Sequence, residues 1–498
     1  MKSYDDYSTI ASQLTLPTQC FIDGAYRAAC SGKTMATVNP ATGELLAEIS
    51  AADSEDVDVA VANARSVFDS GVWSSMHPSE RKQVLLQFAA LIRDNLEPLA
   101  VLESLESGKP IADCIDIDVP GTADCIAWHA EVQDKLYDQI SPSGNDALGM
   151  IIREPIGVAA LVLPWNFPLM MAAWKLGPAL ATGNSVVVKP SEMTSMTALR
   201  LAELAVEAGL PKGVFNVVTG SGVMAGKPLG LHPLVDIVSF TGSTATGRLF
   251  LQYSAQSNMK RVVLETGGKS PCVVVEGADL DRVAEHQAYS FMGNMGQTCT
   301  ANTRLIVHYS LKESLLEKIV AHCKSWKIGA PLDPDTQLGP LISKEQQAKV
   351  SGFIDKGKQE GAKIIYGDGT FDENHANGYF FTPVIFDEVD NSMSIARDEI
   401  FGPVLSVFSV SSDEEAIALA NDTDYGLAAS VYTNDLNRAH RLAREIKAGT
   451  VSINCYSEGD HSTPFGGYKL SGFGGKDNGV QAHEQYTEQK TIWLDLTN

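Results

Sequence analysis

Residues 156–275 alternate short apolar runs with longer amphipathic ones. The stretches GVAALVLPW (157–165) and SVVVKP (185–190) are apolar at nearly every position, which is typical of strands buried on both faces. Residues 195–211 carry apolar positions at helical spacing and end in Gly and Pro, which predicts an amphipathic helix. Strands that alternate with helices in this way predict a parallel, doubly wound sheet. The same scheme continues through residues 214–220, 235–256 and 261–268.

The alternation starts again beyond residue 265. Two separate alternations predict an α/β fold with two doubly wound units. A chain of 498 residues is long enough for each unit to have its own hydrophobic core. The second series predicts strands at residues 270–275, 302–308, 404–410 and 449–456, and helices at 280–293 and 313–326.

Two further strand-like segments lie outside both alternations, DALGMIIREP (146–155) and QYTEQKTIWLDL (485–496). The second places Ile492, Trp493 and Leu494 near a chain end, where water would reach them unless another strand or subunit covered them. We therefore expect these segments to form a small shared sheet or a subunit contact.

Composition and charge narrow the class of protein. The formal net charge is −23, which disfavours a nucleic-acid partner because such a partner requires a basic face. The N-terminal residues lack the features of a leader, and no stretch approaches the roughly 20 apolar residues that span a bilayer. We therefore expect a cytoplasmic protein without a membrane contact. The eight cysteines contain no CxxC pair, so we expect reduced thiols and no metal site.

Two loops of the first alternation are candidates for cofactor binding. In FTGSTATG, Gly242, Ser243 and Gly247 open a helix whose N–H groups could hold a phosphate, and an ordinary strand-to-helix turn is the alternative. In VVVKPSE, Lys189 and Glu192 follow a buried strand. A carboxylate there can take two ribose hydroxyls and would repel a 2′-phosphate, whereas the alternative is a helix cap made by the intervening serine.

Three polar residues are candidates for catalysis. Asn166 lies between Trp165 and Phe167 in PWNFP, and a rigidly held amide there could donate to an oxyanion, although asparagine is also common in turns. Glu265 ends an apolar strand in LETGG, where burial would raise its pKa and suit it as a general base; a solvated strand end is the alternative. Cys299 in GQTC has no adjacent histidine, so locally it is one thiol among eight.

A series of motifs occurs in a fixed order along the chain: PWNFP, KPSE, FTGST, LETGGKSP, GQTC, EIFGP and PFGGYKLSG. This series resembles the NAD(P)-dependent aldehyde dehydrogenase superfamily, and the likeness runs from FIDGAY near residue 21 to TEQKTIW near the C-terminus. The resemblance implies two Rossmann-like domains and a small β flap for oligomerisation. It implies an NAD-binding domain at residues 1–135 and 156–264, a catalytic domain at 265–477, and oligomerisation segments at 136–155 and 478–498.

The resemblance also implies a role for each candidate. Cys299 would be the nucleophile, Glu265 the general base and Asn166 the oxyanion donor. The thiolate would add to an aldehyde, and the thioester left after hydride transfer would be hydrolysed by a water that Glu265 deprotonates. NAD is expected over NADP because of the charge on Glu192. The implied cofactor contacts are Trp165, Lys189, Glu192, Gly242, Ser243, Gly247, Glu399 and Phe401.

Some positions depart from the family pattern. Gly293 stands where relatives often have an aromatic pocket residue, which predicts a roomier tunnel near Cys299. Thr266 replaces a commoner leucine, and we expect this change to be tolerated. An extra glycine precedes Lys476 and Asp477, so a part for either residue in a proton relay stays open at this point.

The segment NCYSEGDHSTPFGGYK (454–469) bears on the substrate. Glu458 and Asp460 stand where enzymes for aliphatic aldehydes tend to have apolar groups, and carboxylates at a tunnel mouth would attract an ammonium or guanidinium group. A solvated acidic loop is the alternative. The expected substrate contacts are Phe167, Trp174, Glu458, Asp460 and Phe465.

The pattern of this segment looks most like the branch that oxidises γ-glutamyl-γ-aminobutyraldehyde and other ω-amino or ω-guanidino aldehydes of polyamine and arginine breakdown. A broad-specificity aliphatic or betaine aldehyde dehydrogenase is the runner-up. A catalytically silent relative and a thiol esterase are alternatives from other classes. The resemblance also implies a homodimer or homotetramer.

Overall fold

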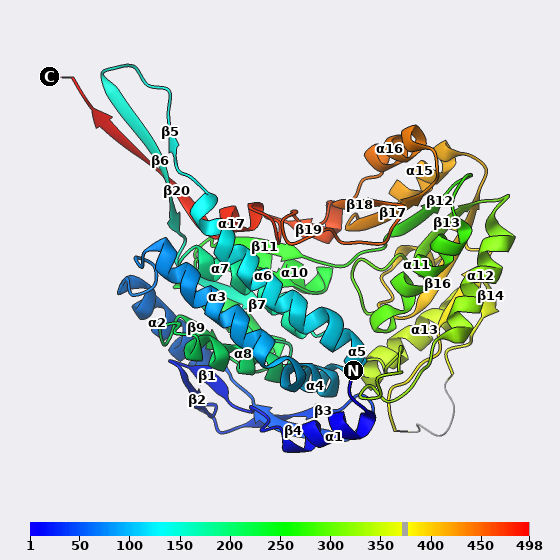
Figure 1. Ribbon diagram of the computed structural model, residues 1–498, viewed down its shortest axis with the longest axis horizontal. Helices are drawn as coiled ribbons and strands as arrows, with labels where there is room; N and C mark the ends of the chain where they lie inside the picture. Colours follow the sequence, from blue (N-terminus) through cyan, green and yellow to red (C-terminus); the bar gives the residue numbers. More distant parts are fainter. Residues whose placement is uncertain (371–376, 498) are drawn as a thin grey trace.

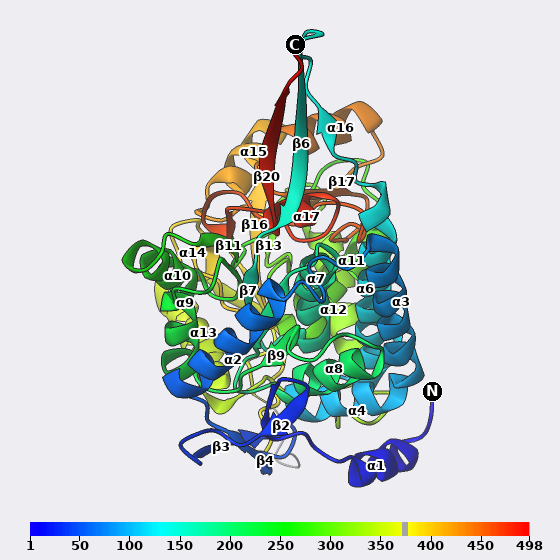
Figure 2. The same cartoon turned by 90° about the vertical axis from the view of Figure 1, so that its left-hand side faces the viewer.

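The structure is a computed structural model that describes residues 1–370 and 377–497. Two α/β bodies lie side by side, and a narrow β-ribbon projects from the first of them (Figures 1 and 2). This arrangement confirms the predicted fold class of two doubly wound units with a separate small sheet.

The first body contains an eight-stranded sheet in the order β19-β11-β10-β7-β8-β9-β1-β2. The strands from β11 to β9 in this order pair in parallel, whereas β1, β2 and β19 pair antiparallel with their neighbours. The strands span β1 Cys20–Ile22, β2 Ala25–Arg27, β7 Val158–Val162, β8 Ser185–Lys189, β9 Phe215–Val217, β10 Ile237–Thr241, β11 Arg261–Glu265 and β19 Gly472–Phe473.

Helices cover both faces of this sheet because its strands are apolar on both sides. Ala159 and Leu161 pack toward one helical layer, whereas Val158 and Ala160 pack toward the other, as alternation along a strand requires. The first layer comprises α3 Pro78–Asp94, α4 Leu96–Ser107, α6 Val119–Val132, α7 Pro168–Ala181 and α8 Met196–Glu207. The second comprises α2 Ser54–Asp69, α9 Lys227–Leu231 and α10 Thr244–Gln256.

Smaller elements complete the first body. They are α1 Tyr4–Gln13, the hairpin of β3 Thr34–Val38 and β4 Leu45–Ser50, and the short helical turns α5 Ile111–Asp113, η1 Cys114–Asp118, η2 Gln133–Lys135 and η3 Gly222–Gly226.

The second body contains a seven-stranded sheet in the order β14-β15-β16-β13-β12-β17-β18, which is parallel except at β14. Its strands span β12 Pro271–Val274, β13 Arg304–His308, β14 Lys363–Tyr366, β15 Val384–Asp387, β16 Val404–Val410, β17 Ala428–Tyr432 and β18 Thr450–Ile453. Its helices are α11 Leu280–Met292, η4 Gly293–Gly296, α12 Lys312–Ser325, α13 Lys344–Glu360, α14 Ser394–Arg397, α15 Asp413–Asn421 and α16 Leu436–Glu445.

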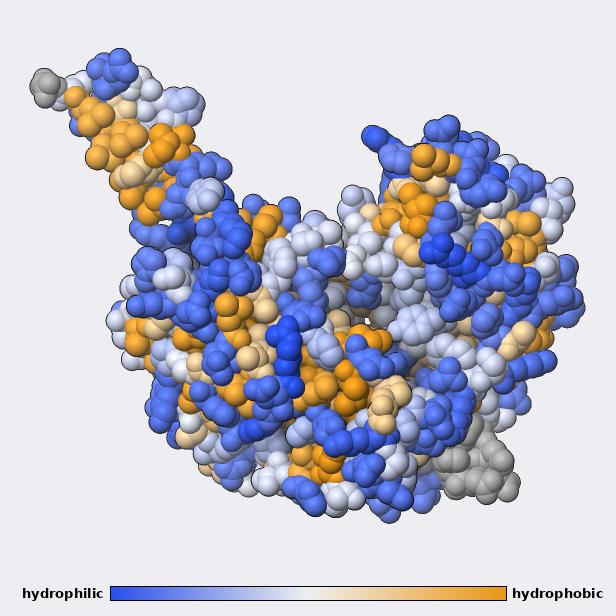
Figure 3. Space-filling view, viewed as in Figure 1, coloured by the Kyte–Doolittle hydropathy of each residue, from blue (hydrophilic) through white to orange (hydrophobic). Residues whose placement is uncertain are grey.

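The two strand-like segments that lay outside both alternations pair with each other. β6 (Ala147–Pro155) and β20 (Thr487–Asp495) run antiparallel over nine residue pairs, and β5 (Gln139–Ile140) adds a short edge. Apolar side chains gather along this ribbon (Figure 3), and Trp493 is 61% exposed at its surface. The expected small separate sheet is therefore present.

Residues near the C-terminus connect the bodies. β19 (Gly472–Phe473) lies within the range predicted for the second domain but adds an edge to the first sheet. The short helical turn η6 (Lys469–Ser471) comes just before β19. The helix α17 (Gln481–Gln485) and the strand β20 follow it. All eight cysteines lie in the described ranges and none forms a disulfide. Within those ranges, no helix combines the length and apolarity that a membrane crossing demands.

Candidate active site

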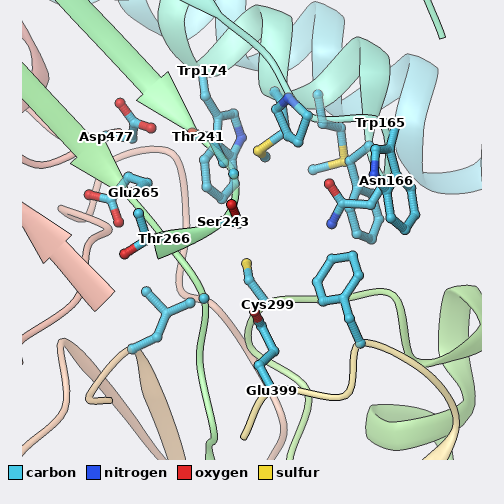
Figure 4. Close-up of a pocket in the computed structure, with 18 of the residues that line it drawn as sticks. Trp165, Asn166, Trp174, Thr241, Ser243, Glu265, Thr266, Cys299, Glu399 and Asp477 are labelled. Carbon is cyan, nitrogen blue, oxygen red and sulfur yellow. The ribbon is translucent and has the colours of Figure 1, made fainter. Parts of the chain in front are cut away.

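A cavity of about 230 Å³ opens between the two bodies, and we call it the main cavity because Cys299, Glu265 and Asn166 all line it. The first body contributes the loops that follow β7 and β10 and the end of β11, and the second contributes the loops that carry Cys299 and Glu399 (Figure 4). Parallel strands bring their carboxyl ends to one edge of a sheet, which explains why residues far apart in sequence meet here. The sulfur of Cys299 lies between Asn166 on one side and Glu265 with Asp477 on the other.

A strained turn places Cys299. Asn294, Met295 and Gly296 all have left-handed backbone conformations, with φ of 49°, 57° and 67°. Such conformations in residues other than glycine cost about 1–3 kcal/mol each, so the surroundings must hold the turn. Gln297 does so, because its side chain donates to the Asn294 carbonyl at 3.1 Å and accepts from the Ile342 N–H at 2.9 Å.

The side chain of Asn166 is buried and lies in the loop between β7 and α7. Its Nδ2 donates to the main-chain carbonyl of Gln297 at 2.9 Å, and the main-chain carbonyl of Asn166 accepts from Asn294 Nδ2 at 2.9 Å. The amide is therefore fixed to the turn that carries Cys299. Sequence reasoning missed Asn294 and Gln297, although a cluster of Gly and Asn after a helix is a signal for a turn of this kind.

Cys299 is surrounded by negative charge. Burial raises the pKa of its thiol well above the usual value, and the carboxylates of Glu458, Glu399 and Glu265 raise it further. These effects favour the protonated thiol over the thiolate.

Glu265 is only 3% exposed, and neither of its carboxylate oxygens has a hydrogen-bond partner among the described residues. Burial raises its pKa well above the usual value, Asp477 adds to that shift, and Lys175 and Lys476 oppose it. A buried carboxyl group with a raised pKa and free oxygens beside a cavity is suited to take a proton from water.

Lys175 and Asp477 form a buried ion pair behind Glu265, with Nζ 2.9 Å from Oδ2. Lys175 also donates to Ser239 at 3.1 Å. Asp477, whose part was open in the sequence, lines the cavity, whereas Lys476 donates to the Gly466 and Gly467 carbonyls. Sequence reasoning missed Lys175; its signal is a single lysine in an otherwise apolar helix, since lysine is almost never buried unless paired.

One side of the cavity fits a cofactor with sugar hydroxyls. Glu399 is half-buried and accepts from the Gly268 N–H at 3.0 Å, and a Cβ at Gly267 would lie 2.2 Å from that carboxylate. The Thr241 hydroxyl is buried there without a partner among the described residues. These groups offer both donors and acceptors to a polar ligand, as ribose hydroxyls require.

Other expected cofactor residues divide into two groups. Gly242, Ser243, Trp165 and Phe401 line the main cavity, where the rings of the last two meet edge to face at 5.2 Å between centroids. Ser243 caps α10 by accepting from the Thr246 N–H. The residues that lie outside the lining of this cavity are Lys189, Glu192 and Gly247.

The residues outside the cavity lining have partners of their own. Lys189 is buried and pairs with Glu192 at 3.3 Å. Gly247 lies against Leu264 and Thr266. The alternative of a helix cap at Ser191 is wrong, because α8 begins after Ser195.

A second cavity of about 250 Å³ leads away from Cys299, and Glu458 lines both cavities. A Cβ at Gly293 would meet nothing closer than the Tyr289 ring at 3.7 Å, so the glycine does leave room in this outer cavity. The ring of Phe167 already receives a cation from the protein, because Lys109 Nζ lies 3.8 Å from its centroid. Phe167 is therefore a poorer cation–π partner for a ligand than the sequence suggested.

Some of the remaining expected substrate contacts line a cavity, and one does not. Trp174 and Phe465 line the main cavity with centroids 4.9 Å apart. Asp460 is exposed, accepts from the Ser462 N–H at 2.8 Å and lines neither cavity. Of the two expected carboxylates, only Glu458 lines a cavity, and the Asp460 carboxylate bonds the main chain of its own loop.

Residues 26–492 match the model of the aldehyde dehydrogenase family. The aminoacetaldehyde dehydrogenase of Pseudomonas aeruginosa is 56% identical over 496 residues, which cover 99% of each chain. The structure of γ-glutamyl-γ-aminobutyraldehyde dehydrogenase from Burkholderia cenocepacia has a TM-score of 0.97 and 47% identity, with both chains fully covered.

A further solved structure bears on the cofactor. The P. syringae indole-3-acetaldehyde dehydrogenase AldA, in complex with NAD+, has a TM-score of 0.98 and 47% identity, with both chains fully covered. The agreement in sequence and in fold extends over the whole chain and includes relatives that bind NAD. The protein belongs to the aldehyde dehydrogenase family and is an NAD-linked oxidoreductase.

Proposed function

We propose that the protein oxidises aldehydes with an ammonium or guanidinium group at the far end, among them γ-glutamyl-γ-aminobutyraldehyde. One observation carries this proposal: Glu458 lines both the reaction cavity and the outer cavity. No described basic side chain forms an ion pair with it. A carboxylate at that junction would attract a cationic tail while the aldehyde carbon reaches Cys299. The relatives that act on aminoacetaldehyde and γ-glutamyl-γ-aminobutyraldehyde support the same class.

The chain's own groups would perform the chemistry in two stages. The Cys299 thiolate adds to the aldehyde carbon, and Asn166 Nδ2 donates to the oxygen that gains the charge. NAD, when bound, would supply the hydride acceptor, and Cys299 would then hold the acyl group as a thioester on its sulfur. Glu265 then removes a proton from a water that attacks the thioester, and the carboxylate product leaves with the thiolate restored.

The proton taken by Glu265 requires an exit from a buried site. Asp477 is the carboxylate that acts most strongly on Glu265, and Lys175 holds it by the ion pair of 2.9 Å. We propose that Asp477 accepts this proton in turn and that Lys175 positions Asp477.

We propose further that residues 1–135 and 156–264 form the NAD-binding domain and residues 265–477 the catalytic domain. Glu399 and Phe401 would meet the nicotinamide end of the cofactor, and Gly242 with Ser243 the pyrophosphate. Lys189 and Glu192 would hold the adenosine ribose, and Gly247 would allow the approach. Glu192→Gln should therefore raise kcat/KM with NADP relative to NAD, because it removes a charge that repels the 2′-phosphate.

Initial rates with NAD over a panel of aldehydes test the substrate class. We expect kcat/KM for 4-aminobutyraldehyde, 4-guanidinobutyraldehyde and γ-glutamyl-γ-aminobutyraldehyde to exceed that for neutral aldehydes of similar length. Glu458→Gln should raise KM most for 4-aminobutyraldehyde and 4-guanidinobutyraldehyde, and less for γ-glutamyl-γ-aminobutyraldehyde, whose far end carries a carboxylate beside its ammonium group. Asp460→Asn is the matched control, because it removes a carboxylate outside both cavities. Higher kcat/KM for all the neutral aldehydes would favour the broad-specificity alternative.

We propose that the ribbon of β5, β6 and β20 (residues 136–155 and 478–498) joins copies of the chain into a cytoplasmic homodimer or homotetramer. Ile140, Trp493 and Leu496 are more than half exposed on this ribbon, at 65%, 61% and 52%. Apolar side chains on paired strands at this exposure favour a covering partner. Light scattering of the wild type and of Trp493→Asp would test this, with a smaller assembly expected for the variant.

A further inference from the structure

Glu458 reaches toward the nucleophile as well as toward the substrate tail. Its Oε1 accepts a hydrogen bond from the Thr300 hydroxyl at 2.5 Å, and Thr300 directly follows Cys299 in the chain. The same hydroxyl lies 3.1 Å from the Tyr456 hydroxyl, so Thr300 is itself held while it donates to Glu458. The group that would bind the far end of the substrate is therefore attached to the segment that carries the attacking sulfur.

We propose that Glu458 makes the ionisation of Cys299 depend on the charge of the bound aldehyde. This inference rests on the proposed function. A cationic tail that pairs with Glu458 cancels the negative charge facing the thiol, and the thiol then loses its proton more readily. A neutral aldehyde leaves that charge in place. The enzyme thus distinguishes cationic from neutral aldehydes by the fraction of Cys299 that is ionised, as well as by binding affinity.

The charges around the sulfur support this assignment. Of the charged neighbours that raise the pKa of Cys299, Glu458 contributes most, ahead of Glu399 and Glu265. Glu399 is engaged by the Gly268 N–H, and Glu265 lies beside the Lys175–Asp477 pair. Glu458 instead faces the tunnel through which the substrate arrives. The other titratable groups that line the two cavities are Lys349 and Asp477 in the inner one and Lys109, Asp113, Asp118, Tyr289 and Tyr456 in the outer one.

The ionisation of the Glu458 carboxyl group depends on whether a cation lies beside it. Burial raises the pKa of its carboxyl group, and the hydrogen bond from Thr300 lowers it. An ammonium group beside it would stabilise the carboxylate and neutralise its field. The step itself is an acid dissociation: the S–H bond of Cys299 breaks, the electron pair stays on sulfur, and the proton passes to water.

Alkylation of Cys299 by iodoacetamide tests the electrostatic part without any turnover. The reagent is neutral and reacts with the thiolate, so its rate against pH reports the pKa of Cys299, read by mass spectrometry of the peptide that contains it. We expect Glu458→Gln to lower that pKa by about one unit, a tenfold gain in thiolate fraction. Glu458→Asp, which keeps the charge, should follow the wild type.

Asp113→Asn is the matched control for this measurement. Asp113 lines the outer cavity but is not among the charges that raise the pKa of Cys299. We expect this variant to alkylate with the wild-type pH dependence. Equal pH dependence in Glu458→Gln and the wild type would overturn the proposal.

The pH dependence of kcat tests the part played by the substrate, because kcat reports the pKa values of groups in the enzyme–substrate complex. In the wild type, the acid limb should lie at lower pH for 4-aminobutyraldehyde than for butyraldehyde, and Glu458→Gln should bring the two limbs together. A preference for the amine that appears in KM alone, with identical limbs, would overturn this inference and leave the proposed function standing. No preference for cationic aldehydes at any pH would instead refute the proposed function.

Discussion

The protein contains two buried Lys–Asp pairs of nearly equal length, and they serve different ends. Lys109 lies 2.8 Å from Asp118 beneath the outer cavity, and Lys175 lies 2.9 Å from Asp477 behind the inner one. All four side chains are 1% exposed or less. Each pair stands beside a buried glutamate, so the two regions contain the same three kinds of ionisable side chain.

The glutamates show the difference. Glu103 accepts a hydrogen bond from Lys109 at 3.4 Å through one oxygen, and burial raises the pKa of its carboxyl group. Glu265 has no such bond among the described residues and faces the cavity that contains Cys299. A buried triad that closes on itself supports the fold, whereas one that leaves a carboxylate free toward a cavity can move a proton.

In the Glu103 region a lysine supplies the positive charge that a metal ion could otherwise provide. Glu103, Cys114 and Asp118 present side-chain atoms within 4.8 Å of one another, which suits a cation. Lys109 already supplies the positive charge there, at 2.8 Å from Asp118. Asp118 and Glu103 in turn raise the pKa of Lys109 against the effect of its burial, so the ammonium stays charged.

The largest expected difference between the two regions is in turnover. Glu265→Gln removes the proposed base, and we expect kcat to fall by ~10²–10⁴-fold, the usual contribution of general base catalysis. NADH should then form in a rapid first turnover, because the thioester still forms but is not hydrolysed. Stopped-flow absorbance of NADH measures both effects. Glu103→Gln, the same substitution in the other region, should retain kcat, and an equal loss in both variants would contradict the comparison.

The next expected effect is on stability and is the same in both regions. Lys109→Met and Lys175→Met each leave a buried aspartate without its cation, which costs ~3–5 kcal/mol of the free energy of unfolding. Urea denaturation followed by fluorescence measures this loss. A double variant that also replaces the aspartate by leucine should recover most of it, because no buried charge is then left unpaired. A loss confined to one region would show that the two pairs are not equivalent.

Much of the fold follows from local pattern. Strand and helix alternation predicted both parallel sheets because strands buried on both faces are apolar at every position, as in β7 and β8. The edge strand β19 could not be predicted in the same way. It is two residues long, and its place beside β11 depends on a pairing with residues far away in the chain.

Some residues of the site could likewise be predicted from the sequence, and others could not. Cys299, Glu265 and Asn166 belong to motifs with a recognisable order, so they could be named from the sequence. The pairing of Lys175 with Asp477 spans 302 positions, and no local pattern reports it. Asp460 was expected beside Glu458 because the two are close in sequence, yet a turn closed by the Asp460 side chain sends it to the surface.

Asp477→Asn should change the pH dependence of kcat, whereas the corresponding substitution in the Glu103 region should not. The carboxylate of Asp477 raises the pKa of Glu265, so its removal lowers that pKa. Glu265 must be deprotonated to act, so the acid limb of kcat should move to lower pH by about one unit. Asp118→Asn removes the corresponding charge beside Glu103 and should leave the limb in place. A shift toward higher pH in Asp477→Asn would contradict the assignment of Glu265 as the base.

The smallest expected effect is the pH dependence of stability beneath the outer cavity. Burial, with Asp118 next, raises the pKa of Glu103 to about 8. The folded protein therefore binds this proton more tightly than the unfolded chain, whose glutamate titrates near 4.3. The contribution of Glu103 to stability is complete below that lower value and is lost as pH rises toward 8. From pH 6 to pH 9, the Tm of Glu103→Gln should thus fall less than that of the wild type, by roughly 1–2 °C. Calorimetry at several pH values would show this, and parallel Tm curves would mean that Glu103 is charged throughout, as Glu265 must be when it acts.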